Sequence, residues 1–203
     1  MMYYRNGGKR VFDFVCALMA LILLSPVLIV VALLVRIKLG SPVIFRQIRP
    51  GWHARHFTLF KFRSMCNTKD DSGRLLLDDQ RLTGFGRFLR ASSIDELPEL
   101  VNVLRGEMSL VGPRPLLIEY LDRYTQEQSR RHEVRPGITG WAQVNGRQDI
   151  PFSKRFQLDV QYADNYCFFL DVRILFMTLF RLQGAGVRSG QDVKEVDDLG
   201  LSD

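Results

Sequence analysis

Cysteine and histidine are scarce in this chain of 203 residues, which holds three of each. Cys16, Cys66 and Cys167 are odd in number and far apart, so they predict neither a disulfide framework nor a zinc site. Such cysteine usage suits a reducing, cytoplasmic setting. His53 and His56 have no cysteine or second histidine pair near them, so we expect no histidine-based metal site and place all three histidines at the surface.

The sequence also lacks internal repeats and the length for two full domains, since single domains usually run to ~100–200 residues. Its formal net charge is only +6, from 28 basic and 22 acidic residues. A modest basic excess suits phosphates, nucleic acid or anionic lipid headgroups, and charge alone does not choose among them.

One long apolar run is present. From residue 14 to residue 35 every side chain is apolar except Ser25 and Pro26, which meets the length criterion for a membrane helix. Proline in a helix interior removes a backbone donor and clashes with the preceding turn, so we predict a break at Ser25–Pro26. The Ser25 hydroxyl is placed to bond one of the freed carbonyls.

Basic residues flank this run on both sides, whereas a spanning helix concentrates them on the cytoplasmic side. A helix folded at its middle would also return Asp13 and Arg36 to one headgroup layer. These features predict a re-entrant, helix-break-helix membrane hairpin over residues 1–39. A kinked span is an equal alternative on the residues alone, and a cleaved signal peptide is disfavoured because the run is too long and has no cleavage site.

The remaining sequence predicts an α/β fold that is mostly α with a short β-hairpin. Alternating residues from 41 to 65 favour two strands around a turn at Pro50–Gly51. Residues 66–83 read as an exposed loop with one helical turn at 75–77, and helices are expected from Leu97 to near Gly106 and over 116–124. Residues 153–182 predict either amphipathic interfacial helices or core helices. We assign 40–183 to one globular domain and 184–203 to a mobile tail.

The adjacent carboxylates Asp95 and Glu96 are the main candidates for chemistry. Ser93 and Glu96 also have the spacing of a capping box, in which both acids would only start a helix. At a helix N-terminus, however, one acid can serve as a nucleophile and the other as a metal ligand, where backbone amides also favour phosphate.

Several cations accompany the acidic pair. Two prolines around one arginine fix its backbone for gripping a phosphate, although they also suit a stiff connecting turn. No single one of these cations identifies a ligand. Together, however, they suit a pyrophosphate donor and a phosphate acceptor, which carry several negative charges. The candidate residues are Lys61, Arg90, Pro113, Arg114, Pro115 and Arg147.

Five motifs in one order carry a resemblance that covers nearly the whole chain. They are Ser25-Pro26 in the apolar run, Lys61-Phe-Arg-Ser-Met65, Asp95-Glu-Leu-Pro98, Met108-Ser-Leu-Val-Gly-Pro-Arg-Pro115 and Arg135-Pro-Gly-Ile-Thr-Gly140. In this order they resemble the bacterial sugar transferases, the monotopic polyprenyl-phosphate phosphoglycosyl transferases. The chain is similar to the smallest members, such as the enzyme that starts bacterial N-linked glycosylation, which lack extra N-terminal membrane helices.

The resemblance implies transfer of a sugar-1-phosphate from a UDP-sugar donor to polyprenyl (undecaprenyl) phosphate, with release of UMP, at the cytoplasmic face of the bacterial inner membrane. It implies that residues 40–183 form the cytoplasmic catalytic domain. It also implies a ping-pong route with Asp95 as nucleophile and Glu96 as a ligand of Mg²⁺. An N-acetylated amino sugar is the expectation among small members, a homodimer is left open, and no nucleic acid partner is implied.

The resemblance also distributes the binding roles. Arg90 would contact the polyprenyl phosphate, Pro113, Arg114 and Pro115 the nucleotide, and Lys61 and Arg147 the phosphates. Ser25 and Pro26 would set the re-entrant angle.

Two other classes compete with this interpretation. A non-catalytic membrane adaptor would use the acids as a helix cap and the arginines for anionic lipid. A magnesium-dependent phosphatase or nucleotide hydrolase would pass an aspartyl phosphate to water instead of lipid.

Overall fold

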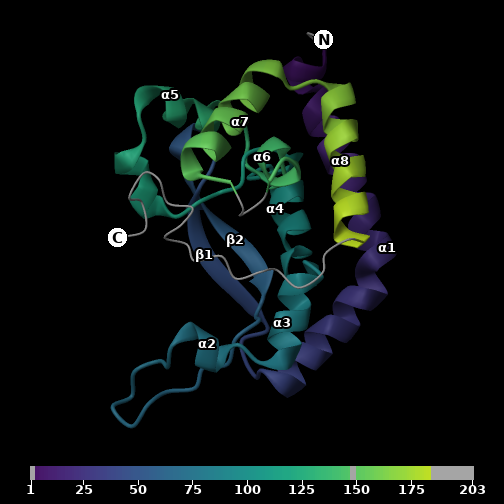
Figure 1. The fold of residues 1–203 in the computed structure, drawn as a ribbon. Coiled ribbons are helices and arrows are strands. Elements are labelled where there is room, and N and C mark those ends of the chain that lie inside the picture. Colours follow the sequence, from purple (N-terminus) through teal and green to yellow (C-terminus); the bar gives the residue numbers. More distant parts are fainter. Residues whose placement is uncertain (1–2, 147–149, 184–203) are drawn as a thin grey trace.

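The computed structural model describes residues 3–146 and 150–183 (Figure 1). Its helices are α1 (Lys9–Lys38), α2 (Asp78–Arg81), α3 (Gly84–Ala91), α4 (Glu99–Arg105), α5 (Gln126–Ser129), α6 (Trp141–Val144), α7 (Phe152–Asn165) and α8 (Phe168–Gln183). Its strands are β1 (Ile44–Pro50), β2 (His56–Phe62), β3 (Ser109–Val111) and β4 (Gly137–Thr139). A π-helical turn at Tyr4–Gly8 precedes α1, and 3₁₀ helices occupy Trp52–Ala54, Ile94–Glu96, Ile118–Arg123 and Arg130–Glu133. The expected mostly helical fold with a short hairpin is confirmed, and the predicted tail at 184–203 lies outside the described residues.

The long helix α1 runs through the Ser25–Pro26 pair without interruption. Pro26 has no N–H to offer the carbonyl of Ile22, and the Ser25 hydroxyl donates to that carbonyl instead, at 2.8 Å. Figure 1 shows α1 changing direction partway along its length. The expected break is therefore a bend within a continuous helix, because the serine supplies a bond that the proline removes. The re-entrant topology itself stays a prediction.

One side of α1 packs against the rest of the molecule both before and after the bend. Ala17 belongs to a core cluster with residues of β2 and α4, whereas Val31 and Val35 pack in a second cluster with Phe62 and Leu89. The opposite side exposes large apolar side chains throughout, and only 11% of the most apolar stretch is buried. By length and composition this helix could cross a membrane, and a large exposed apolar surface of this kind is typical of a membrane or protein contact.

Strands β1 and β2 form the predicted antiparallel hairpin, with the turn after Pro50. Phe45 pairs with Lys61, and Arg49 pairs with Phe57. Because directly opposed residues point to one face and alternate along each strand, Lys61 and Arg49 share the face that packs on α4.

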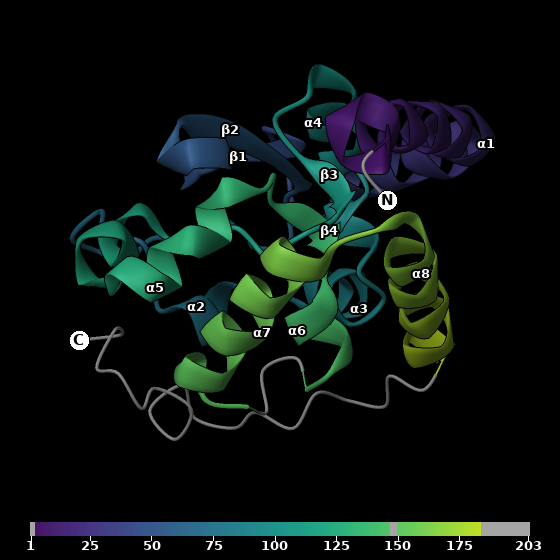
Figure 2. The same cartoon turned by 90° about the horizontal axis from the view of Figure 1, so that it is seen from above.

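A second, two-stranded sheet was not expected from the sequence. Strands β3 and β4 pair in parallel, with Ser109 opposite Gly137 and Val111 opposite Thr139. Three-residue strands are too short to show a clear period, which explains why the pattern did not reveal them. Figure 2 shows the hairpin and α1 on one side of this pair and α6 and α7 on the other.

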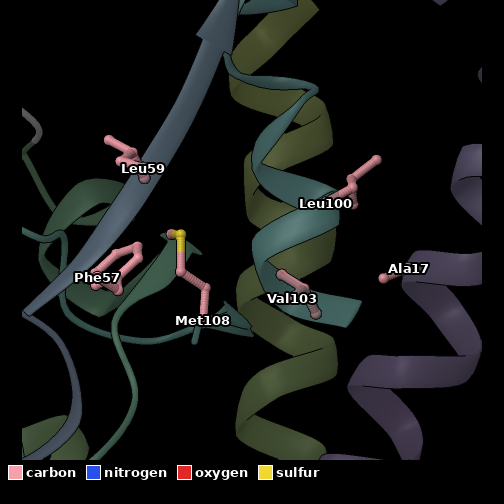
Figure 3. Packing of buried hydrophobic residues seen from close by; sticks show 6 residues of the cluster. All are labelled: Ala17, Phe57, Leu59, Leu100, Val103 and Met108. Carbon is pink, nitrogen blue, oxygen red and sulfur yellow. The ribbon is translucent and has the colours of Figure 1, made fainter. Parts of the chain in front are cut away.

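The core cluster nearest the hairpin joins α1, β2 and α4. Figure 3 shows Met108 between Phe57 of β2 and Val103 of α4, with Ala17 of α1 on the far side of α4. Met108, Val103 and Ala17 have no exposed surface. The packing fixes β2 against α4.

Some local expectations are wrong. His132 is buried rather than exposed, because its ring packs against Tyr124 and its Nδ1 lies 3.3 Å from the carbonyl oxygen of Gly51. The helical turn expected at residues 75–77 is instead α2, three residues later. The helix expected over 116–124 is a 3₁₀ helix at Ile118–Arg123.

One charged residue of the apolar stretch in α8 lies inside the fold. Asp171 of α8 is fully buried and accepts hydrogen bonds from Tyr162, Tyr4 and Lys9. The outer side of α8 exposes Phe169, Phe176, Leu179 and Phe180. The helix is therefore amphipathic, with its buried acid tying it to α7 and to the start of the chain.

Candidate active site

The acidic pair sits in a tight turn before α4. Ser93 adopts a left-handed conformation with φ of 56° and makes no side-chain cap bond, and Ile94–Glu96 forms a 3₁₀ helix. The Glu96 side chain bonds to Lys61 and Arg114. The capping-box alternative is therefore wrong, and the left-handed serine is the kind of local strain found at functional sites.

Glu96 is held by two cations. Its Oε1 lies 2.6 Å from Nη2 of Arg114 and 2.9 Å from Nζ of Lys61. Burial alone would raise the pKa of Glu96, but the charges and hydrogen bonds of Arg114 and Lys61 outweigh it and hold that pKa well below its ordinary value. Glu96 is thus a fixed, ionised carboxylate.

Glu99 is a third carboxylate of the site that our sequence analysis missed. It is almost fully buried, and its Oε1 lies 3.2 Å from Nζ of Lys61. Burial raises the pKa of Glu99 to about 7, against the charge of Lys61 and with that of Glu96. The available signal was its position four residues after Asp95, one helical turn along.

Asp95 differs from both glutamates in its surroundings. It is 8% exposed, and its carboxylate makes no hydrogen bond or ion pair within the described part of the chain. The positive charges of Lys61, Arg90 and Arg114 act on it. Its pKa is raised by burial and by the charge of Glu96, and those cations oppose the rise. Among the described carboxylates of the site, Asp95 is the acid whose oxygens are not already engaged by described residues.

Arg114 is fixed from behind by residues that the sequence did not single out. Its backbone carbonyl accepts a hydrogen bond from Arg131 at 2.8 Å. Arg131 is buried, paired with Asp159 at 2.7 Å and bonded to the hydroxyl of Tyr124. Beside it, the carbonyl of Pro113 accepts from the N–H of Gly137 at 3.0 Å. The segment Pro113–Pro115 therefore holds its arginine over Glu96.

The remaining predicted cations fall in different places. The Nε of Arg90 donates to the hydroxyl of Ser64 at 2.9 Å, and its charge acts on Asp95. Arg147 lies outside the described residues. The structure thus brings together Lys61, Arg90, Asp95, Glu96 and Arg114.

The carboxylates of the site fit only a partial set of Mg²⁺ ligands. The described residues contain no group of three or more histidine, cysteine or acidic side chains with metal-binding geometry. Mg²⁺ usually takes only one or two carboxylates and completes its octahedron with water and substrate phosphates. The ionised Glu96 beside Asp95 fits such a partial set, although one Glu96 oxygen already contacts two cations.

The chain is similar in sequence to known proteins of one family. Residues 4–184 match the family described as bacterial sugar transferase. The chain is 56% identical over 171 residues to the uncharacterized sugar transferase EpsL of Bacillus subtilis, covering 84% of this chain and 85% of that protein.

Larger relatives are named by their reactions. The UDP-glucose:undecaprenyl-phosphate glucose-1-phosphate transferase of Escherichia coli is 41% identical over 183 residues, 85% of this chain and 39% of that protein. The UDP-N-acetylgalactosamine-undecaprenyl-phosphate N-acetylgalactosaminephosphotransferase of Aeromonas hydrophila is 40% identical over 189 residues, 89% of this chain and 45% of that protein. The chain thus spans less than half of these two relatives. It belongs to the bacterial sugar transferase family and is an enzyme of the phosphoglycosyl transferase class.

Proposed function

We propose that this enzyme transfers a sugar-1-phosphate from a UDP-sugar to undecaprenyl phosphate and releases UMP, as the first membrane step of glycoconjugate assembly. The observation that carries the proposal is the difference in bonding between the neighbouring acids. Glu96 is tied to Lys61 and Arg114, whereas Asp95 is unengaged among the described residues and faces the same cations. Names of relatives such as the Escherichia coli enzyme support the donor and acceptor classes.

In the first half-reaction a carboxylate oxygen of Asp95 attacks the β-phosphorus of the donor. A bond forms between that oxygen and phosphorus, the bond from phosphorus to the bridging oxygen breaks, and UMP leaves with the electron pair. Arg114 and Lys61 hold Glu96 in place beside the reacting phosphorus. Mg²⁺ bound at Glu96 would neutralise charge on the phosphates.

In the second half-reaction a phosphate oxygen of the polyprenyl acceptor attacks the same phosphorus. The bond to Asp95 breaks, the carboxylate is restored, and polyprenyl diphosphate sugar is released. Arg90, on the α3 side of the acid, is the cation that we assign to the acceptor phosphate. This sequence of steps is the ping-pong route.

The packing of α1 supports a monotopic arrangement. Near its start Asp13 accepts a hydrogen bond from the backbone N–H of Leu110, and near its end Val35 shares a cluster with Phe62 and Leu89. If α1 crossed the bilayer, the protein segments packed on both of its ends, with their backbone polar groups, would be drawn into the hydrocarbon region. Placing such groups in hydrocarbon is costly. We therefore place α1 as a re-entrant helix in one leaflet, α8 at the interface, and the site on the cytoplasmic face of the inner membrane.

The sugar is the finer part of the proposal. We propose an N-acetylated amino sugar, the expectation for small members of the family. One relative is named for UDP-N-acetylgalactosamine, which supports this choice, and another for UDP-glucose. A plain hexose is therefore the comparison that any assay must include.

The test is UMP release by the purified enzyme in lipid nanodiscs, with Mg²⁺, over a panel of UDP-sugars, with and without undecaprenyl phosphate. We expect one sugar to give release that Asp95→Asn abolishes, and a radiolabelled phosphosugar that stays on the wild-type protein without acceptor. Asp71→Asn, in the exposed loop before α2, is the matched control and should behave as wild type.

The competing classes predict different results. Sustained turnover without undecaprenyl phosphate would indicate a hydrolase. Absence of release from every sugar, or an Asp95→Asn variant equal to wild type, would return the acids to a structural role and favour the adaptor.

A further inference from the structure

One cation near the site, Arg49, has no role in the two half-reactions. Arg49 of β1 is partly buried, and its Nη2 donates to Oε1 of Gln47 at 2.7 Å. Its Nε is buried with no hydrogen-bond partner. Within the described ranges, 3–146 and 150–183, no carboxylate lies at ion-pair distance from this guanidinium. A buried guanidinium donor without an acceptor is costly, which points to an anion that binds there.

The register of the hairpin places Arg49 on the face of the sheet that carries Lys61. Lys61 in turn binds Glu96 and Glu99. The charges of Arg114, Glu119 and Glu99 act on Arg49. Burial and the like charge of Arg114 lower its pKa. Arg49 therefore lies on the Lys61 face of the hairpin, toward its turn end, within reach of the charge of Arg114.

The other candidate cations that the structure describes are already engaged. Lys61 and Arg114 bind Glu96, and Arg90 donates to Ser64 on the α3 side. A UDP-sugar brings two phosphates, and the one that leaves with uridine gains charge as its bond breaks. Neutralising that phosphate takes a cation beyond those that hold the carboxylates.

We propose that Arg49, oriented by Gln47, is a donor-binding residue that contacts the phosphate on the nucleoside side of the UDP-sugar. This inference rests on the proposed function and adds to it a nucleotide subsite between β1 and Arg114. The guanidinium donates through its free Nη and Nε hydrogens to that phosphate and stabilises the departing UMP. Arg49 has no part in binding the lipid phosphate.

The test compares Arg49→Gln with Arg46→Gln. Arg46 is an exposed arginine of the same strand on the opposite face, where its guanidinium lies over Phe60 at 5.8 Å. In ping-pong kinetics, kcat/KM for each substrate reports only its own half-reaction. We expect Arg49→Gln to lower kcat/KM for the UDP-sugar by roughly 10- to 100-fold, the range for a lost charged hydrogen bond. The value for undecaprenyl phosphate should stay unchanged, Arg49→Lys should recover part of the loss, and Arg46→Gln should match wild type.

Calorimetric titration with UDP gives a second readout that needs no turnover. Weaker UDP binding by Arg49→Gln alone, with an unchanged melting temperature, is the expected result. A loss confined to the acceptor half-reaction, or unchanged kinetics and UDP binding, would overturn the inference while Asp95-dependent UMP release still stood. If wild type released no UMP, the proposed function would fail, and the UDP titration would still decide the role of Arg49.

Discussion

Arg131 and Arg114 lie 17 residues apart in the chain and are joined by a 2.8 Å hydrogen bond from the Arg131 guanidinium to the Arg114 carbonyl. The bond links a buried ion pair, Arg131 with Asp159, to the arginine that holds Glu96. The site is therefore supported through the backbone of the Pro113–Pro115 segment. Residues that touch no substrate are expected to affect it.

The first prediction concerns Asp159. In Asp159→Asn the guanidinium of Arg131 stays buried without its counterion, and breaking a buried pair in this way costs about 3–5 kcal/mol. We expect a lower melting temperature and lower donor kcat/KM. Thermal unfolding and UMP release measure the two effects. Arg130→Gln, which removes a partly exposed arginine with three carboxylate partners, should change both little.

The second prediction concerns the pH dependence of stability at Glu99. A carboxyl whose pKa is raised by folding stabilises the fold below its unfolded value of about 4.3, and this stabilisation is lost as the pH rises through the folded value. The folded value here is about 7. The melting temperature of Glu99→Gln, measured relative to that of wild type, should therefore rise as the pH increases from about 5 to about 8.

The relative gain is on the order of 3 kcal/mol, because one pKa unit corresponds to about 1.4 kcal/mol. Melting curves across this range, with the exposed Glu127→Gln as control, measure it. A difference between Glu99→Gln and wild type that did not change with pH would contradict the assignment.

The third prediction concerns the close approach of two backbones. A Cβ on Gly140 would lie 2.1 Å from the carbonyl oxygen of Gly112, whereas a Cβ on Gly84 would meet nothing within 4 Å. Gly140→Ala should lower the free energy of unfolding by about 1–3 kcal/mol, the typical cost of overpacking. Gly84→Ala should be neutral or slightly stabilising. Denaturant unfolding of both variants in one detergent compares them, and equal stability would contradict the packing.

The fourth prediction concerns topology. With the native cysteines replaced, Tyr3→Cys and Ser41→Cys place a thiol before and after α1, both at exposed positions. If α1 stays in one leaflet, an impermeant thiol reagent should label both in inside-out vesicles and neither in intact cells. Labelling of the two thiols from opposite sides would establish a spanning helix.

The sequence predicted features set by short-range chemistry. The alternation of β1 and β2, the end of α4 at Gly106 and the Ser25 bond to Ile22 all depend on neighbours within a few residues. Motif order also brought forward Lys61, Arg114 and the acidic pair.

Contacts between residues far apart in the chain were not predicted from the sequence. Glu99 reads as an ordinary helix acid until β2 places Lys61 beside it. In the sequence Asp171 only interrupts an apolar stretch, whereas in the fold it bonds to Tyr162 and pairs with Lys9. The β3–β4 pair joins segments about which period alone says little. Such features are decided by which elements meet, and local pattern does not encode that.

The double-sided packing of α1 has a consequence for how the enzyme can be handled. Removing residues 1–38 would strip Ala17, Val31 and Val35 from two core clusters and bare Phe62 and Leu89 to water. A catalytic fragment made in this way should aggregate instead of behaving as a soluble domain. One face of α1 is thus part of the protein interior, while the other exposes apolar side chains, so the helix cannot be treated as a removable anchor.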